Sequence, residues 1–397
     1  MEMEQEHGFD VAIATFRRNI NVRGNAVDEF LEAVRDGRHL HAKVFIAANR
    51  VDPNLWLGQQ RETALHVAAE NGHSEFCEFL LEIGADKDQK DVRVKIPLHL
   101  AAAGGHLDVV RLLVEAGSNL DNIDKFGKQP LMYAVAGAHV ETVKFLLETG
   151  SSVTSGRNWH ALHEACKVGS PELVQILIDA GARVNNPRHY SGGAPWSPLH
   201  IAVRHGNLDC IKLLIKAGAD VNSINAGRHT PLHEAAYRGY ENVIQELLLH
   251  GADPHAASNQ RRTPLHEACM QGNVQSAMML LDVGSKVNAR DFVTDTPLHL
   301  ALRANHACDI ATQLTCVLLR YGASSTLMGR DDEMPLDIAK QSSQDYSLEL
   351  LESALEIPQP LVNICKVSVR KQLACHWDRI SELPLPVTLK TFVTSVA

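Results

Sequence analysis

The feature that most constrains this chain is a short unit that recurs along most of its 397 residues. The unit reads Pro-Leu-His in its clearest copies, and its leucine returns at intervals of 33, 33, 31, 37, 33, 33, 33 and 38 residues. These leucines are Leu65, Leu98, Leu131, Leu162, Leu199, Leu232, Leu265, Leu298 and Leu336. One such unit cannot cover its own apolar face, so neighbouring units must stack. The period therefore predicts an elongated array.

Each part of the unit has a readable structural role. The cleanest copies begin Thr-Pro-Leu-His at Thr230, Thr263 and Thr296, where Thr supplies a helix N-cap and Pro fits the first helical turn. Small alanines follow and let neighbouring helices approach. A second apolar helix such as 211–216 ends in a Gly-Ala-Asp turn such as 218–220, with Gly in the left-handed C-cap conformation.

These residues resemble the ankyrin repeat, whose period and T-P-L-H-x-A signature they meet nearly throughout. The resemblance implies an all-α fold with short β-hairpin fingers, a solenoid of about ten repeats. A weaker copy at 30–37 fits an N-terminal cap that faces water on one side. We expect a mobile N-terminal segment at 1–24, the ankyrin array at 25–356, and a separate C-terminal element at 357–397.

Departures from the period locate insertions. The finger before Leu199 is lengthened within 187–196, and the helical part between Leu298 and Gly322 is longer by five residues around 306–315. The finger before Leu162 is two residues short. A lengthened finger in the middle of an array either contacts a ligand or is an insertion that the exposed surface tolerates. The sequence leaves both alternatives open.

The C-terminal element carries two spaced motifs. Its first is an apolar seam at i, i+3, i+4 and i+8 of a helix, formed by Leu361, Ile364, Cys365 and Val369. Its second is the proline elbow Leu383, Pro384, Leu385 and Pro386, which forbids a continued helix. In this order the motifs resemble a SOCS box. The resemblance implies that the seam binds elongin C and that the elbow binds cullin-5. Lys366, Val369 and Phe392 stand where the family more often has Arg, Ile and Tyr.

Together the two regions resemble the ankyrin repeat and SOCS box proteins. The resemblance implies a non-catalytic, substrate-recognition subunit of an elongin B/C–cullin-5–RING ubiquitin ligase, whose array binds a target protein. The alternative is an ankyrin scaffold whose terminal box is only a structural cap. A third hypothesis is an enzyme of unrecognised type, for which the sequence offers no candidate catalytic site.

The composition of the chain limits the classes of partner that it is expected to bind. A formal net charge of -9 argues against general nucleic-acid binding, and no apolar stretch approaches the length of a membrane span. The eight cysteines are scattered and read as reduced thiols. These features predict a cytoplasmic protein without a membrane partner, and they leave a nuclear pool open.

No cofactor or metal is expected. Seven histidines hold the Pro-Leu-His position, where the ankyrin family uses the imidazole to join adjacent repeats: His66, His99, His163, His200, His233, His266 and His299. Three of them are followed by Glu, yet Lys167, Tyr237 and Met270 stand where a zinc-protease motif needs its second histidine. We therefore expect no catalytic residues.

The predicted target-binding surface combines arginines with aromatic residues. The finger windows 152–159, 187–196, 222–229 and 255–262 contain arginines and no acidic residue, and three of the four tryptophans also lie in fingers. Arg with aromatic residues is typical of interface anchors, so we expect an acidic or phosphorylated target segment. The alternative is ordinary exposed surface. The predicted residues are Arg157, Trp159, Arg188, Tyr190, Trp196, Arg204, Arg228, Arg238, Arg261 and Arg262.

A further pattern concerns Asn185, Asn222 and Asn288, each preceded by a leucine eight residues earlier. The pattern resembles ankyrin sites of asparaginyl hydroxylation. Asn is also a frequent turn residue, and that interpretation is favoured.

Overall fold

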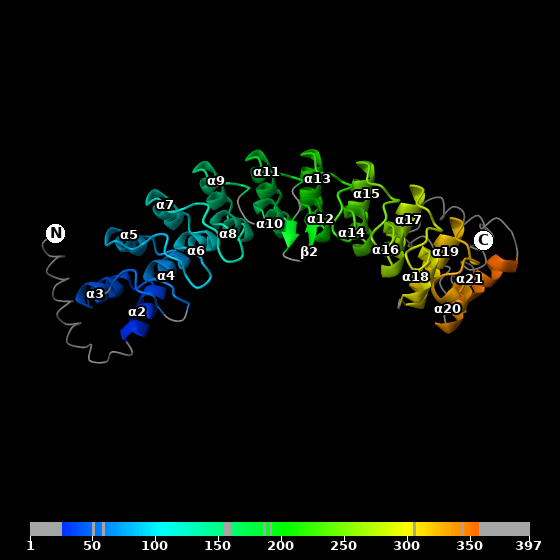
Figure 1. Cartoon of the computed structure of the whole chain (residues 1–397), viewed down its shortest axis with the longest axis horizontal. Helices are drawn as coiled ribbons and strands as arrows, with labels where there is room; N and C mark the ends of the chain where they lie inside the picture. Colours follow the sequence, from blue (N-terminus) through cyan, green and yellow to red (C-terminus); the bar gives the residue numbers. More distant parts are fainter. Residues whose placement is uncertain are drawn as a thin grey trace, which may run out of the picture. The chain divides into compact units, whose positions relative to one another are not determined.

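The computed structural model describes residues 26–49, 52–57, 60–154, 160–185, 188–190, 193–304, 307–342 and 345–356. The segment 1–24 and the C-terminal element 357–397 lie outside the described residues. The chain divides into two compact units, Met1–Gly192 and Gly193–Ala397. Figure 1 shows the helices and strands of both units.

The first unit is a series of helix pairs. Within it, first helices pack on first helices, α4 on α6 and α6 on α8, and second helices pack likewise, α5 on α7. The bounds are α2 (Ala26–Arg35), α3 (His39–Asn49), α4 (Ala64–Glu70), α5 (Ser74–Glu82), α6 (Pro97–Gly104), α7 (Leu107–Glu115), α8 (Pro130–Ala136), α9 (Val140–Glu148), α10 (Ala161–Val168) and α11 (Pro171–Asp179), followed by β1 (Arg188–Tyr190).

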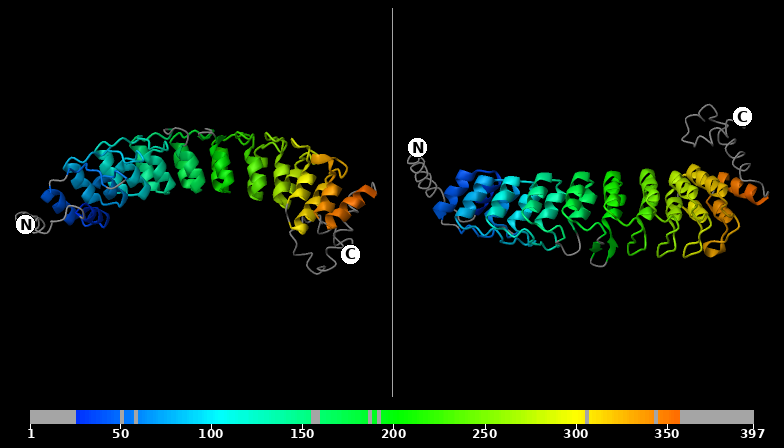
Figure 2. Two further views of the ribbon diagram at one scale, coloured as in Figure 1. Left: turned by 60° about the horizontal axis from the view of Figure 1, so that its bottom comes forward. Right: turned by 90° about the horizontal axis from the view of Figure 1, so that it is seen from above.

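The second unit repeats this arrangement, and its connecting fingers project from one side of the helices (Figure 2). Here α14 packs on α16 and α16 on α18, with α15 against α17. The bounds are β2 (Gly193–Trp196), α12 (Pro198–Arg204), α13 (Leu208–Lys216), α14 (Pro231–Arg238), α15 (Glu241–Leu249), α16 (Pro264–Gln271), α17 (Val274–Asp282), α18 (Pro297–Arg303), α19 (Cys308–Arg320), η1 (Arg330–Asp332), α20 (Pro335–Gln341) and α21 (Asp345–Glu356). The ankyrin-type solenoid is confirmed.

The recurring unit starts its helix as its chemistry predicts. Thr230, Thr263 and Thr296 are extended N-cap residues, each followed by Pro, and each forms a capping box with the histidine at the third helical position. The last turns of α13 and α15 lead into Gly218 and Gly251, whose φ angles of 85° and 83° are left-handed. A side chain would be strained there.

The core lies between the stacked helices. In α14, Leu232, Ala235 and Ala236 have no solvent exposure, and in α15 the same holds for Ile244 and Leu247. The alanines leave room for the neighbouring first helix, so each repeat completes the core of the next.

The expected departures from the period are partly visible. Helix α19 has 13 residues where α17 has 9, so the expected longer helical part is present and the second helix is the longer one. The long finger contains the short strands β1 and β2. The other described fingers are turns rather than ladders, with one isolated bridge between Leu57 and Glu62. The short finger before Leu162 includes residues 155–159, which lie outside the described part.

The Pro-Leu-His imidazole joins consecutive repeats through both ring nitrogens. The Thr230 N–H donates to Nδ1 of His233 over 3.1 Å, and Nε2 lies 3.0 Å from the carbonyl oxygen of Arg262 in the next finger. A carbonyl only accepts, so Nε2 carries the proton and the ring is neutral. The equivalent bridges run from His66 to Lys95, His99 to Lys128, His200 to His229, His266 to Asp295 and His299 to Glu333. For these six histidines the predicted structural role is confirmed.

Protonation of these rings is disfavoured in the folded chain. Burial lowers the pKa of His99, His200, His233 and His266 from 6.5 to about 4. A second proton on Nδ1 would also face a backbone N–H. Because the folded pKa is depressed, the stability that each ring contributes is complete above pH 6.5 and is lost as the pH falls toward 4.

We therefore expect the urea midpoint of unfolding to be steady above about pH 7 and to fall below about pH 6.5, as the unfolded chain takes up protons. Circular dichroism during urea titrations at a series of pH values measures this. His233→Gln should lower the midpoint at neutral pH and flatten its dependence on pH. His255→Gln, at an exposed finger histidine, is the control and should leave the profile unchanged. A flat wild-type profile down to about pH 5 would contradict the argument.

Candidate target-binding surface

Three fingers of the second unit, 220–229, 253–262 and 286–295, are joined directly at their tips. The backbone N–H of Asn259 donates to the carbonyl of Gly227 over 2.8 Å, and that of Phe292 donates to the carbonyl of Gln260 over 2.7 Å. The tips therefore form a continuous line in which each finger holds the next.

Each tip turns through a left-handed residue. Arg228 and Arg261 both have φ of 57°, and Thr294 has φ of 70°. A residue with a side chain rarely takes this conformation, so the turn must be held from outside. A side-chain acceptor near the start of each turn does so, and its bond to the backbone N–H four residues on measures 3.0 Å from Asn225, 3.2 Å from Ser258 and 2.9 Å from Asp291.

In two of the finger windows that lack acidic residues, a neutral side chain replaces the aspartate that accepts this hydrogen bond in other fingers. Asp91 and Asp124 hold the equivalent turns of the first unit, as Asp291 does in the second. In the fingers of Arg228 and Arg261 the acceptor is instead Asn225 or Ser258, which is neutral. These two tips keep the turn without its negative charge.

The structure separates the predicted arginines into two groups. Arg228 and Arg261 are exposed and have no ion-pair partner among the described residues. Arg204 is also exposed, and its guanidinium lies over the Trp196 ring, 5.0 Å from the ring centroid. These three arginines leave their positive charge uncompensated on the surface.

The other described arginines are engaged within the fold. Arg238 pairs with Glu234 over 3.2 Å. The Nε of Arg262 lies 3.4 Å from Oδ2 of Asp291, whose side chain is 1% exposed, and its Nη1 lies 3.3 Å from Sδ of Met270. Arg262 therefore compensates a buried carboxylate, and a target that bound it would compete with that role.

The remaining predicted residues are less defined. Arg157 and Trp159 lie outside the described residues, and Arg188 and Tyr190 lie in β1 with undescribed side chains. Sequence reasoning also missed one residue of the same type. Arg61 has φ of 54° at a fingertip of the first unit, and its guanidinium lies 4.7 Å from the Trp56 ring centroid. Aligning Arg61 with Val94, 33 residues later, would have found it.

Two of the three candidate hydroxylation residues bridge repeats. Asn222 donates through Nδ2 to the Gly251 carbonyl and accepts the N–H of Asp253 through Oδ1, over 3.0 and 2.8 Å. Asn288 makes the same pair of bonds with Gly322 and Ser324. These contacts give both residues a structural role.

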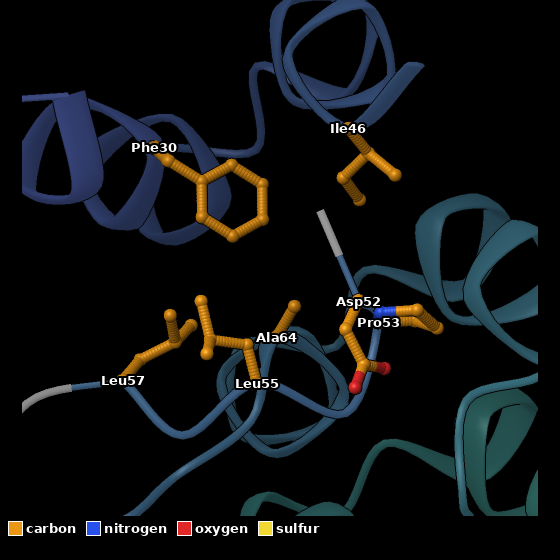
Figure 3. A pocket seen from close by; sticks show the side chains of 7 residues that line it. All are labelled: Phe30, Ile46, Asp52, Pro53, Leu55, Leu57 and Ala64. Atoms are coloured by element: carbon orange, nitrogen blue, oxygen red, sulfur yellow. The ribbon is translucent and has the colours of Figure 1, made fainter. Parts of the chain in front are cut away.

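No catalytic constellation is apparent in the described part of the chain. A small pocket in the first unit is lined by Phe30, Ile46, Asp52, Pro53, Leu55, Leu57 and Ala64 (Figure 3). Its one ionisable side chain, Asp52, accepts the N–H of Asn54 over 2.9 Å, so the lining offers no acid–base pair. No three His, Cys, Asp or Glu side chains of the described residues gather as metal ligands.

Comparison with known proteins identifies the family to which this architecture belongs. A family model of ankyrin repeats matches residues 30–91, 84–157, 162–258 and 232–329, and a SOCS box model matches residues 357–394. The chain belongs to the ankyrin repeat and SOCS box family. A solved human ASB11 ankyrin repeat domain is 28% identical, with a TM-score of 0.50, over 55% of this chain and 97% of that one. No curated protein sequence matches.

Both matched domains mediate interactions, and their combination is that of an adaptor of the cullin–RING ligase type. The predicted docking residues of the box, from Leu361 to Pro386, lie outside the described residues and stay predictions. None of the described helices is long and apolar enough to cross a membrane.

The two neighbouring arginines of one finger should differ sharply in their effect on stability. Arg262→Ala leaves the Asp291 carboxylate buried without its cation, and we expect it to lower the free energy of unfolding by about 1–3 kcal/mol. Arg261→Ala removes an exposed, unpaired side chain and should change it by less than about 0.5 kcal/mol. Urea unfolding of both variants tests this. Equal losses would show that Arg262 has no compensating role.

Proposed function

We propose that this chain is the substrate-recognition subunit of an elongin B/C–cullin-5–RING ubiquitin ligase. The observation that carries the proposal is the presence of a stacked ankyrin array and a SOCS box in one chain. Leu361, Ile364, Cys365 and Val369 form the seam that would enter elongin C, and Leu383 to Pro386 would engage the cullin.

In this proposal the chain promotes the reaction by holding the target close to the reacting groups. The array holds a target protein while the box docks the complex that carries activated ubiquitin, so that a target lysine stays within reach. In this proposal the chain contributes binding, and its partners carry out the reaction. This role needs only two binding surfaces on one chain.

The target surface that we propose is the finger side of the array. In the second unit it comprises Arg228, Arg261 and the Arg204–Trp196 stack, whose charges are uncompensated. Arg157, Trp159, Arg188 and Tyr190 extend the same proposal to the neighbouring fingers. Positive charge beside aromatic rings suits a protein segment that is acidic or phosphorylated.

Elongin binding should depend on the seam. The double variant Leu361→Pro, Cys365→Phe breaks the helix and overfills its apolar face, so co-precipitated elongins B and C should fall to background. The control is Leu40→Ala in α3, which changes an exposed leucine of the array. Wild type without elongin would exclude the ligase function and favour the scaffold alternative. Equal elongin with both proteins would exclude the assigned seam.

Cullin binding should separate from elongin binding. Replacing Leu383, Pro384, Leu385 and Pro386 by alanine removes the elbow while leaving the seam intact. We expect this variant to retain elongins B and C and to lose cullin-5, as measured by immunoblotting of the same precipitates. Retention of cullin-5 would show that the elbow does not select it.

A further inference from the structure

The tips of the second unit place two arginines, an aromatic residue and a valine in one line, which we call the tip ridge: Arg228, Arg261, Phe292 and Val293. The backbone bonds from Asn259 to Gly227 and from Phe292 to Gln260 make the three tips immediate neighbours. Phe292 is 74% exposed and Val293 is 38% exposed. Large apolar side chains at this exposure, beside unpaired cations, are typical of a binding surface.

The ridge itself is positively charged, because none of its four residues is acidic and Arg228 and Arg261 have no ion-pair partner among the described residues. Asn225 and Ser258 replace the aspartates that hold equivalent turns elsewhere. The two acids of the next finger, Asp291 and Asp295, are each 2% exposed. Asp291 lies 3.4 Å from Arg262, and Asp295 lies 3.5 Å from Arg303. Their charge is thus compensated below the surface.

We propose that the tip ridge binds an extended acidic segment of the target, with one carboxylate side chain on Arg228, a second on Arg261 and an apolar side chain on Phe292. This assignment rests on the proposed function and specifies its substrate class. A planar guanidinium pairs with a carboxylate through two parallel hydrogen bonds, so a single arginine suffices for each acidic residue.

The geometry favours carboxylates over the other anions. Sites for a phosphoryl group gather several cations around one dianion, whereas here each exposed arginine belongs to a separate finger. Single-stranded nucleic acid needs successive aromatic platforms and an attracting field. The described tips of this ridge carry only one such ring, that of Phe292.

The experiment uses the full chain co-purified with elongins B and C. Random peptides displayed on phage are selected on wild type, and the winning peptides are synthesised for fluorescence anisotropy. We expect winners with two separated Asp or Glu residues and an apolar residue on one side. Arg228→Gln with Arg261→Gln should weaken binding by about tenfold or more, and high salt should weaken wild type likewise. Phe292→Ser should abolish the apolar preference alone.

The matched control is Lys212→Gln with Lys216→Gln, which removes the same charge from exposed positions of α13. It should bind as wild type does, and co-purified elongin should be equal in all variants. Winners without acidic bias, equal binding by the arginine variant, or tighter binding of phosphoserine peptides or single-stranded DNA would overturn the inference. If any of these results is obtained while elongin is retained, the inference about the tip ridge fails and the proposed adaptor function is unaffected. If wild type does not co-purify with elongin, the adaptor function fails and the peptide-binding result is judged separately.

Discussion

The neutral imidazole of the Pro-Leu-His unit is the contact on which the rest of the structure depends. One ring nitrogen accepts from the N-cap of its own helix, and the other donates to a carbonyl in the next finger. His200 and His233 hold in this way the two fingers that carry Arg228 and Arg261. The surface available to a target is therefore positioned by buried rings that must stay uncharged, since a proton on the second nitrogen would oppose a donor.

The turn at each fingertip requires a hydrogen-bond acceptor at its first position, but it does not fix the charge of that acceptor. Its first position needs an acceptor for backbone N–H groups, and Asp, Asn and Ser all provide one at 2.9–3.2 Å. A change from aspartate at this position alters the electrostatics of a tip while keeping its conformation. Where aspartate remains at Asp291, the Nε of Arg262 lies 3.4 Å from its carboxylate. The fold thus separates the arginines that support it from those that face solvent.

The sequence predicts what is local and periodic in this chain. The helix starts at Thr-Pro, the bridging histidines and the long second helix α19 follow from residues close together in sequence. Arg261 and Arg262 could not be told apart, because the residue that distinguishes them, Asp291, lies 29 positions later. Arg61 escaped notice because it precedes the clearest copies of the unit. The seam of the box is read from spacing alone, since its residues lie outside the described structure.

The target surface proposed for the described fingers is open, so it discriminates targets through the spacing of its surface groups. In the second unit that spacing is set before a target arrives, because backbone bonds of 2.7 and 2.8 Å join consecutive tips. Binding then orders mainly side chains, which limits the entropic penalty of association. A segment with the wrong interval between its acidic residues would leave one guanidinium unpaired and lose that contact. Selectivity in such a surface comes from the repeat itself, because each finger contributes its side chain at a fixed interval from the next.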